Sequence, residues 1–451
     1  MSIWASASSA ETNRRRQPPG AQHRGAESVR RSVLMWIPGA EALNRGARFV
    51  VVALLARELG AQGYGSWVYA AALAMIVANG SDLGLTTVLT TRIARAPDDA
   101  RRFIATTVAL IPLLALGPAL ALLFVAAVFA RDAAVLLLLL GAAGVCDSVG
   151  YLLLAPLRAI GKMLPEAATR GAQGLVLLAA SPPLLLVGHR GAVAIAALFL
   201  AVSTMALAAG VCGLVVTFGL PRPRLHRDVA GRLIGDALPL FFAVVVTLVY
   251  FRADALVISA LRGPRDTGLY AAAYNIAFGC SFLPLMFQRV LLPGMAAADT
   301  PHALRVAYAG AMRQVGAIAV ALCAVLAAFT PLLPRIYGSD FEGSQSTYLL
   351  LLPAFGLYFL TYINYTLLLA RGRNAAALWL TVLALAVNLS ANFALIPALG
   401  ANGAALAACA SEGVLLAAQL PLVRGLLLSP AEAGEPARAE LAQRETDRLA
   451  A

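Results

Sequence analysis

The feature that most constrains this chain is a series of twelve long hydrophobic runs. Each has about 20 or more mostly apolar residues, the length that a helix needs to cross a bilayer. The runs do not alternate polar with apolar residues, which argues against the strands of a β-barrel. The sequence therefore predicts an all-α polytopic membrane protein with about 12 transmembrane helices. The runs cover residues 33–57, 66–91, 104–129, 134–157, 167–187, 191–218, 236–261, 268–293, 310–333, 346–370, 375–397 and 402–427.

Composition agrees with this fold class. Hydrophobic residues make up 60% of the 451 residues and charged residues only 13%, too few to cover the surface of a soluble protein.

The net charge of +12 is distributed unevenly along the chain. Of the 35 Lys and Arg residues, 25 fall on the side of the membrane that holds both termini and 6 fall on the other. The remaining four lie within the hydrophobic runs. Positive residues concentrate in cytoplasmic segments, so we expect both termini in the cytoplasm and no nucleic-acid partner.

The first hydrophobic run carries unusually many polar residues. Glu41, Arg45 and Arg48 are spaced at i, i+4 and i+7, which places them on one helix face, with Asn44 beside them. Charged side chains within a bilayer turn toward a bundle interior or a water-filled cavity. We therefore expect the other helices to enclose a polar cavity against this face. The alternative is that Glu41 and Arg45 form an i, i+4 pair that only joins helices.

The chain also repeats itself. Gly60-Ala-Gln-Gly-Tyr-Gly65 is echoed 203 residues later by Gly263-Pro-Arg-Asp-Thr-Gly268, and Gly161-Lys162 is echoed by Gly372-Arg373. Each half contains six runs, an even number, so the halves have the same orientation across the membrane. Two such lobes, rocking around a site near the midplane, are typical of alternating-access transporters.

The repeat sets the expected domain organisation. We expect a disordered basic cytoplasmic tail at residues 1–32 and an N-terminal six-helix lobe at 33–218. A basic cytoplasmic linker at 219–235 then leads to a C-terminal six-helix lobe at 236–427 and a cytoplasmic tail at 428–451.

Ordered motifs along the chain carry a resemblance to a known family. They are Ala56-Arg-Glu-Leu-Gly60-x-x-Gly63-Tyr-Gly65, Asp82-Leu-Gly-Leu85, Arg252-x-Asp254, Gly263-x-x-x-x-Gly268-Leu-Tyr270 and Asn388-x-x-x-Asn392-Phe-x-Leu-Ile-Pro397-x-x-Gly400. As a set they resemble the oligosaccharide-lipid flippases of bacterial polysaccharide biosynthesis. These belong to the multidrug, oligosaccharidyl-lipid and polysaccharide exporter superfamily. The resemblance covers about residues 33 to 425.

The resemblance implies a function. A protein of this kind moves a polyprenyl-pyrophosphate-linked oligosaccharide from the inner to the outer leaflet of the bacterial plasma membrane, for O-antigen, capsule or exopolysaccharide. It is not an enzyme and needs no cofactor. Its expected partners are the lipid-linked oligosaccharide, membrane lipids, and a polysaccharide polymerase with other export machinery.

Such a substrate needs cations within the membrane. The planar guanidinium of arginine offers forked donors that suit a pyrophosphate. The candidate substrate-binding residues are Arg45 and Arg48 with Asn44 in the first run, Arg252 in the seventh and Arg289 in the eighth. Arg289 lies near the cytoplasmic end of its run, where it can also reach the interface by snorkelling.

Acidic residues within the runs have two possible roles. Glu41, Asp82, Asp254 and Glu412 either neutralise arginines across helices or bind a coupling proton or sodium ion. Asp82 lies between Gly80 and Gly84, where we expect a loosened helix. Arg252 and Asp254 are about 200° apart on a helix, so both cannot face the cavity.

Polar residues on the eleventh run join this set. Asn388 and Asn392 are one turn apart, and we expect them to hydrogen-bond to neighbours such as Glu412.

The sequence is also compatible with two other functions. A proton- or sodium-coupled multidrug cation antiporter of the same superfamily would depend on the acids instead of the arginines. A membrane-embedded polysaccharide polymerase or glycosyltransferase would need a loop large enough for a catalytic site. The largest connection on the outer side starts at Pro334 and spans only about a dozen residues. No nucleotide-binding glycine-rich loop with lysine and no metal-ligand cluster is present in the sequence.

Overall fold

The computed structural model describes residues 19–185 and 191–428, and within these ranges every regular element is a helix. The first half contains α2 (Pro19–Ala78), η1 (Asn79–Ser81), α3 (Leu85–Arg95), α4 (Ala100–Val128), α5 (Ala134–Ala159), α6 (Leu164–Leu185) and α7 (Gly191–Phe218). The second half contains α8 (Arg227–Arg262), α9 (Pro264–Ala277), α10 (Phe282–Ala296), α11 (Pro301–Ala328), α12 (Leu333–Tyr337), α13 (Ser344–Ala370), α14 (Asn374–Leu399) and α15 (Ala401–Leu428).

These helices form a multi-pass membrane protein. In the described part of the chain, ten helical segments are long and apolar enough to span a membrane. One of them, residues 39–95, turns back at Gly60 and so supplies two crossings. The more polar α6 packs beside α2 and α7 as a further membrane-length helix. The expected twelve-helix fold is therefore confirmed.

The glycines of the sequence repeat take matching backbone conformations. Gly60 has φ 64° and ψ 179°, and its counterpart Gly263 has φ 86° and ψ −177°. Gly161 and Gly372, the second pair, have φ of 79° and 69°. Side chains larger than hydrogen are strained at such positive φ values, which explains why glycine recurs at these turns. The parallel repeat of two lobes is thus present in the backbone as well as in the sequence.

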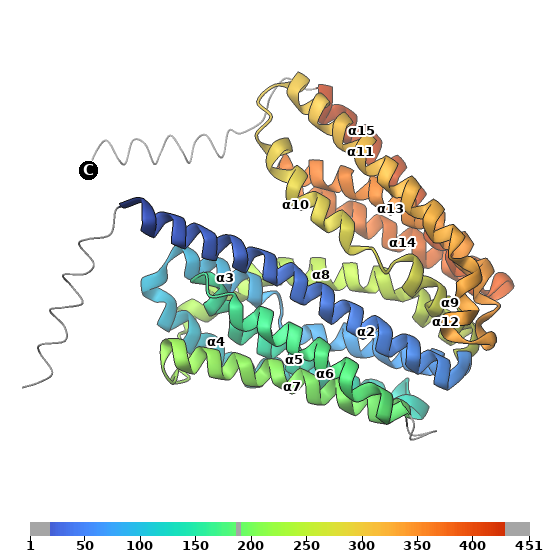
Figure 1. Ribbon diagram of the computed structural model, residues 1–451, viewed down its shortest axis with the longest axis horizontal. Coiled ribbons are helices and arrows are strands. Elements are labelled where there is room, and N and C mark those ends of the chain that lie inside the picture. The colour runs from blue at the N-terminus through green and yellow to red at the C-terminus, as the bar shows by residue number, and fades with distance from the viewer. Residues whose placement is uncertain (1–18, 186–190, 429–451) are drawn as a thin grey trace, which may run out of the picture.

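The lobes meet at the end of the molecule that carries these two hairpins, which we call the hairpin end. A Cβ atom on Gly65 would lie 1.7 Å from the carbonyl oxygen of Pro264, and one on Gly268 would lie 1.9 Å from that of Ala61. The repeat relates Gly65 to Gly268 and Ala61 to Pro264, so the two contacts are equivalent. Figure 1 shows the two groups of helices converging near α9 and α12 and diverging toward the opposite end.

Helix α8 packs against both lobes. Its beginning, with Val229 and Leu233, shares a core with Phe103 of α4, whereas Val257 and Ile258 near its end belong to the core of the second lobe. An ion pair between Arg92 and Asp236 and another of 3.7 Å between Arg102 and Asp228 reinforce the contact with the first lobe. The lobe boundary near residue 236 stays a prediction. Along α8, the first turns pack against the first lobe and the last turns pack against the second.

The first helix overlaps the expected N-terminal tail of residues 1–32, whose disorder stays a prediction. Helix α2 begins at Pro19, inside residues 1–32, because proline suits the first turn and the alanine, glutamate and arginine residues that follow favour helix. Residues 1–18 and the C-terminal residues 429–451 lie outside the described ranges.

Candidate functional site

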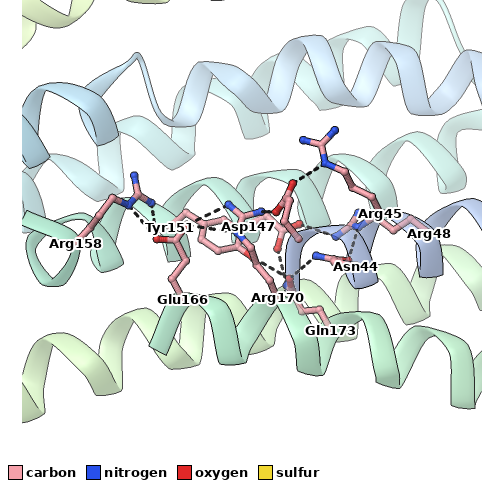
Figure 2. Close-up of polar contacts among 10 residues, drawn as sticks. Asn44, Arg45, Arg48, Asp147, Tyr151, Arg158, Glu166, Arg170 and Gln173 are labelled. Carbon is pink, nitrogen blue, oxygen red and sulfur yellow. Dashed lines mark hydrogen bonds and ion pairs between the residues drawn. The ribbon is translucent and has the colours of Figure 1, made fainter. Parts of the chain in front are cut away.

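Helices α2, α5 and α6 bring a set of polar side chains together in the first lobe (Figure 2). We call this set the arginine network, and its members are Glu41, Asn44, Arg45, Arg48, Asp147, Tyr151, Arg158, Glu166, Arg170 and Gln173. Four arginines face three carboxylates, which leaves one positive charge in excess.

Arg48 is held by three contacts. Its Nε donates to Asn44 Oδ1 at 3.2 Å, and its Nη2 lies 3.3 Å from Asp147 Oδ2 on α5. The guanidinium also lies 5.3 Å from the ring centroid of Phe199, within the range of a cation–π contact. The Arg48 side chain is 34% exposed, so its guanidinium remains accessible to a further ligand in addition to these partners.

Arg45 is held more loosely. Its Nε donates to Glu41 Oε1 at 2.7 Å, the i, i+4 pair that the sequence offered as an alternative, and its side chain is 59% exposed. The other carboxylate oxygen of Glu41 accepts from Arg170 Nη1 of α6 at 2.8 Å. More than half of the Arg45 side chain therefore stays accessible to a further anionic partner beside Glu41.

Gln173 connects the network. Its Nε2 donates to Asp147 Oδ1 at 3.0 Å, while its Oε1 accepts from the Tyr151 hydroxyl at 2.8 Å and from Asn44 Nδ2 at 3.4 Å. The residue is fully buried with these groups satisfied. It therefore fixes the positions of Asn44 and Asp147, the two partners of Arg48.

Sequence reasoning missed the α6 side of this network. Glu166 and Arg170 were not among the candidate residues, but α6 begins at Leu164 and turns Arg170 toward α2. Glu166 accepts from both arginines, at 2.8 Å from Arg158 and 3.3 Å from Arg170. The i, i+4 spacing of Glu166 and Arg170 was the available signal.

In the second lobe, the buried acids Asp254 and Glu412 have no cationic partner among the described residues. Asp254 is 5% exposed and accepts from the Tyr270 hydroxyl and, at 2.6 Å, from Asn392 Nδ2. Asn392 also donates to Asn388 at 2.9 Å. The two asparagines therefore contact Asp254 of α8, and their expected contact with Glu412 is wrong.

Glu412 has a separate environment. It is 3% exposed and accepts from the Tyr250 hydroxyl at 2.8 Å and from Thr361 Oγ1 at 2.9 Å. Tyr250 belongs to α8 and Thr361 to α13, so the Glu412 carboxylate lies where α15 packs against these two helices. Asp254 and Glu412 are thus two buried carboxyl groups in one lobe, each held only by neutral donors within the described part of the chain.

Asp82 lies at a break in the second membrane crossing. The chain passes through η1 and reaches positive φ at Leu83 (47°) and Gly84 (76°) before α3 begins. Asp82 Oδ1 accepts from the backbone N–H of Thr86 at 3.0 Å and from its hydroxyl. The loosened helix expected here is present, and the carboxylate stabilises the restart of the helix.

A cavity of about 190 Å³ separates the lobes close to the hairpin end. Its lining includes Arg252 and five aromatic side chains, namely Tyr64, Trp67, Phe251, Tyr270 and Tyr274. Asp254 points away from this space, in agreement with the angle between it and Arg252. Arg289 is exposed on α10 and does not line this cavity.

The comparisons with known proteins agree with this architecture. A family model described as polysaccharide biosynthesis protein matches residues 33–298. No curated protein matches the chain by sequence.

Among solved structures, the chain is similar to an inward-facing multidrug resistance MATE family transporter of the MOP superfamily. The identity is 16%, the TM-score is 0.67, and the match covers 87% of this chain and 96% of the other. The lipid II flippase MurJ in an inward closed conformation matches at 13% identity and a TM-score of 0.66, covering 86% and 87%. An outward-facing MATE transporter matches at 16% identity and a TM-score of 0.55, covering 89% and 94%. The fold is similar to that of these MATE and MurJ structures, and the chain belongs to the polysaccharide biosynthesis protein family.

Proposed function

We propose that this protein is a flippase that moves a polyprenyl-pyrophosphate-linked oligosaccharide from the cytoplasmic to the outer leaflet of a bacterial inner membrane. The observation that carries the proposal is the arginine network, a partly exposed cationic cluster at membrane depth in a chain of the polysaccharide biosynthesis family. Transport serves the assembly of a surface polysaccharide, and a polymerase on the outer side consumes the product.

The chemistry of the substrate fits the network. A pyrophosphate cannot cross hydrocarbon unpaired, because unpaired charge in the membrane core is too costly. Arg45 and Arg48 are 59% and 34% exposed, and both guanidiniums can take a second, anionic partner. Arginine binds phosphate oxygens in a forked geometry that lysine cannot reproduce. The lipid tail stays in the bilayer while the head group moves through the polar interior.

The arrangement of the lobes supports loading from the cytoplasm. The distribution of positive residues favours cytoplasmic termini, and with that orientation the hairpin end faces outward. The lobes touch at that end through Gly65 and Gly268. Greater similarity to the inward-facing than to the outward-facing MATE transporter supports the same orientation.

A second function is favoured by one specific observation. Asp254 and Glu412 are buried and have no cationic partner among the described residues, an environment that suits exchange of a proton or sodium ion. In a multidrug cation antiporter these acids would bind the drug or the coupling ion, and the arginine network would be structural.

Reconstituted vesicles distinguish the two functions. We expect the wild-type protein to move a fluorescent prenyl pyrophosphate bearing a sugar across the bilayer, and Arg45→Ala and Arg48→Ala to slow this at least about tenfold. Lysine at either position should restore only part of the rate. Arg313→Ala, an exposed arginine of α11 away from the network, is the matched control and should transport normally.

Two results would contradict the flippase. One is full transport by both alanine variants at normal protein level. The other is a wild-type protein that ignores the prenyl pyrophosphate but exchanges ethidium for protons or sodium.

A further inference from the structure

The cavity near the hairpin end is built by repeat-related positions of the two lobes. Residues 203 apart line it together, including the pairs Val52 with Ala255, Trp67 with Tyr270, and Ala71 with Tyr274. The cavity is therefore centred between the lobes, where a rocking motion exposes it first to one side and then to the other.

The cavity continues the polar face of α2. Val52 lines it, and Arg48 precedes Val52 by four residues, about 6 Å along the helix axis. Glu41, Arg45, Arg48 and Val52 follow one another at spacings of four, three and four, so they share one face. A molecule bound by the arginine network can thus extend along α2 into the cavity.

The walls of the cavity are suited to a sugar ring. Five aromatic side chains line it, and aromatic faces stack against the apolar faces of a ring. Its volume of about 190 Å³ is below the roughly 300–1,000 Å³ of sites for drug-sized ligands. The space therefore accommodates one sugar residue rather than a whole lipid-linked oligosaccharide.

Arg252 gives this cavity a charge that the fold does not require. It is the only charged residue in the lining and makes no ion pair or hydrogen bond with any residue that the structure describes. The repeat-related position holds Phe49, so the architecture tolerates an apolar residue there. Asp254, two residues away, bonds to Tyr270 and Asn392 and does not neutralise it. A cation left unpaired at membrane depth is costly, which indicates that an anionic ligand is its partner.

We propose that this cavity binds a sugar residue that carries a carboxylate, with Arg252 as the residue that selects it. The inference rests on the proposed function, in which the pyrophosphate occupies the arginine network. With the pyrophosphate at Arg45 and Arg48, a sugar of the attached glycan extends toward Arg252, and a uronic acid presents its carboxylate there. Arginine pairs with a carboxylate through two parallel hydrogen bonds.

The test compares two probes in reconstituted vesicles, namely prenyl pyrophosphate bearing glucose and the same lipid bearing glucuronic acid. We expect the wild-type protein to transport the acidic probe at least about tenfold better at limiting concentration. Arg252→Gln should remove this preference by slowing only the acidic probe. Arg252→Lys should keep part of it. Arg313→Gln is the matched control and should leave both rates unchanged.

Other results in the two-probe experiment would contradict the acidic-sugar site or the flippase function. Equal wild-type rates for the two probes, or an unchanged preference in Arg252→Gln, would overturn the proposal. If Arg252→Gln slows both probes equally while its melting temperature is unchanged, Arg252 binds the pyrophosphate and the acidic-sugar site is wrong. If the wild-type protein moves neither probe, the proposed function itself fails.

Discussion

At the scale of single residues, the two lobes differ in the partners of their membrane-embedded carboxylates. The first lobe pairs arginines with carboxylates, whereas Asp254 and Glu412 in the second are bonded only to hydroxyl and amide donors within the described chain. We predict that an imposed proton or sodium gradient accelerates wild-type transport and that Asp254→Asn abolishes this acceleration. Asparagine keeps the size of the side chain, its Oδ1 can still accept from Asn392 and its amide can donate to the Tyr270 hydroxyl oxygen, so the free energy of unfolding should fall by less than about 1 kcal/mol.

Glu412→Gln provides the comparison, because it removes the other buried carboxyl group of the same lobe. Loss of the gradient effect in only one of the two variants identifies the coupling acid. Wild-type transport that ignores both gradients would show that neither acid is coupled, and membrane potential or removal of product would have to drive the cycle.

At the scale of elements, the break between α2 and α3 needs a stabilising group. Asp82 supplies it by accepting from the N–H and the hydroxyl of Thr86. We predict that Asp82→Asn keeps both stability and transport, since the amide oxygen accepts the same bonds. Asp82→Ala should lower the free energy of unfolding by about 1 kcal/mol, the usual cost of losing a side-chain bond at a helix start. Thermal unfolding in detergent measures the first quantity and vesicle transport the second.

An Asp82→Asn variant that is as stable as wild type but inactive would contradict this structural role. It would place Asp82 among the ion-coupling residues instead.

At the scale of the whole molecule, the hairpin end closes by direct contact between backbones. Asp340 joins the lobes there, since its Oδ2 accepts from the N–H of Ala61 at 2.6 Å. We predict that Gly65→Ala prevents closure, because its Cβ would lie 1.7 Å from the carbonyl oxygen of Pro264. In intact cells, Cys at position 71 in the cavity, in an otherwise cysteine-free protein, should then react faster with an impermeant thiol reagent.

The matched control is Gly310→Ala on α11, where an added Cβ meets nothing within 4 Å. It should leave labelling at position 71 and transport unchanged. Equal labelling in Gly65→Ala and wild type would show that the contact does not hold the outer side shut. Labelling of a Cys at position 224 from outside would reverse the assumed orientation.

The sequence by itself determined the properties that depend on neighbours along the chain. Hydropathy located the twelve crossings, glycine spacing revealed the repeat, and Gly80 and Gly84 marked the break beside Asp82. The common face of Glu41, Arg45 and Arg48 also follows from helix periodicity alone. These signals are local, because transmembrane length and helix rotation per residue are fixed by the bilayer and the backbone.

The tertiary structure decided which of the charged residues meet. Arg48 pairs with Asp147, 99 residues away, and Asp254 bonds to Asn392, 138 residues away. Arg252 faces the cavity between the lobes, while Arg289, equally prominent in the sequence, lies outside it. Such pairings depend on how each helix is rotated about its axis, and that rotation is set by packing against helices distant in the chain rather than by the run of residues that forms the helix.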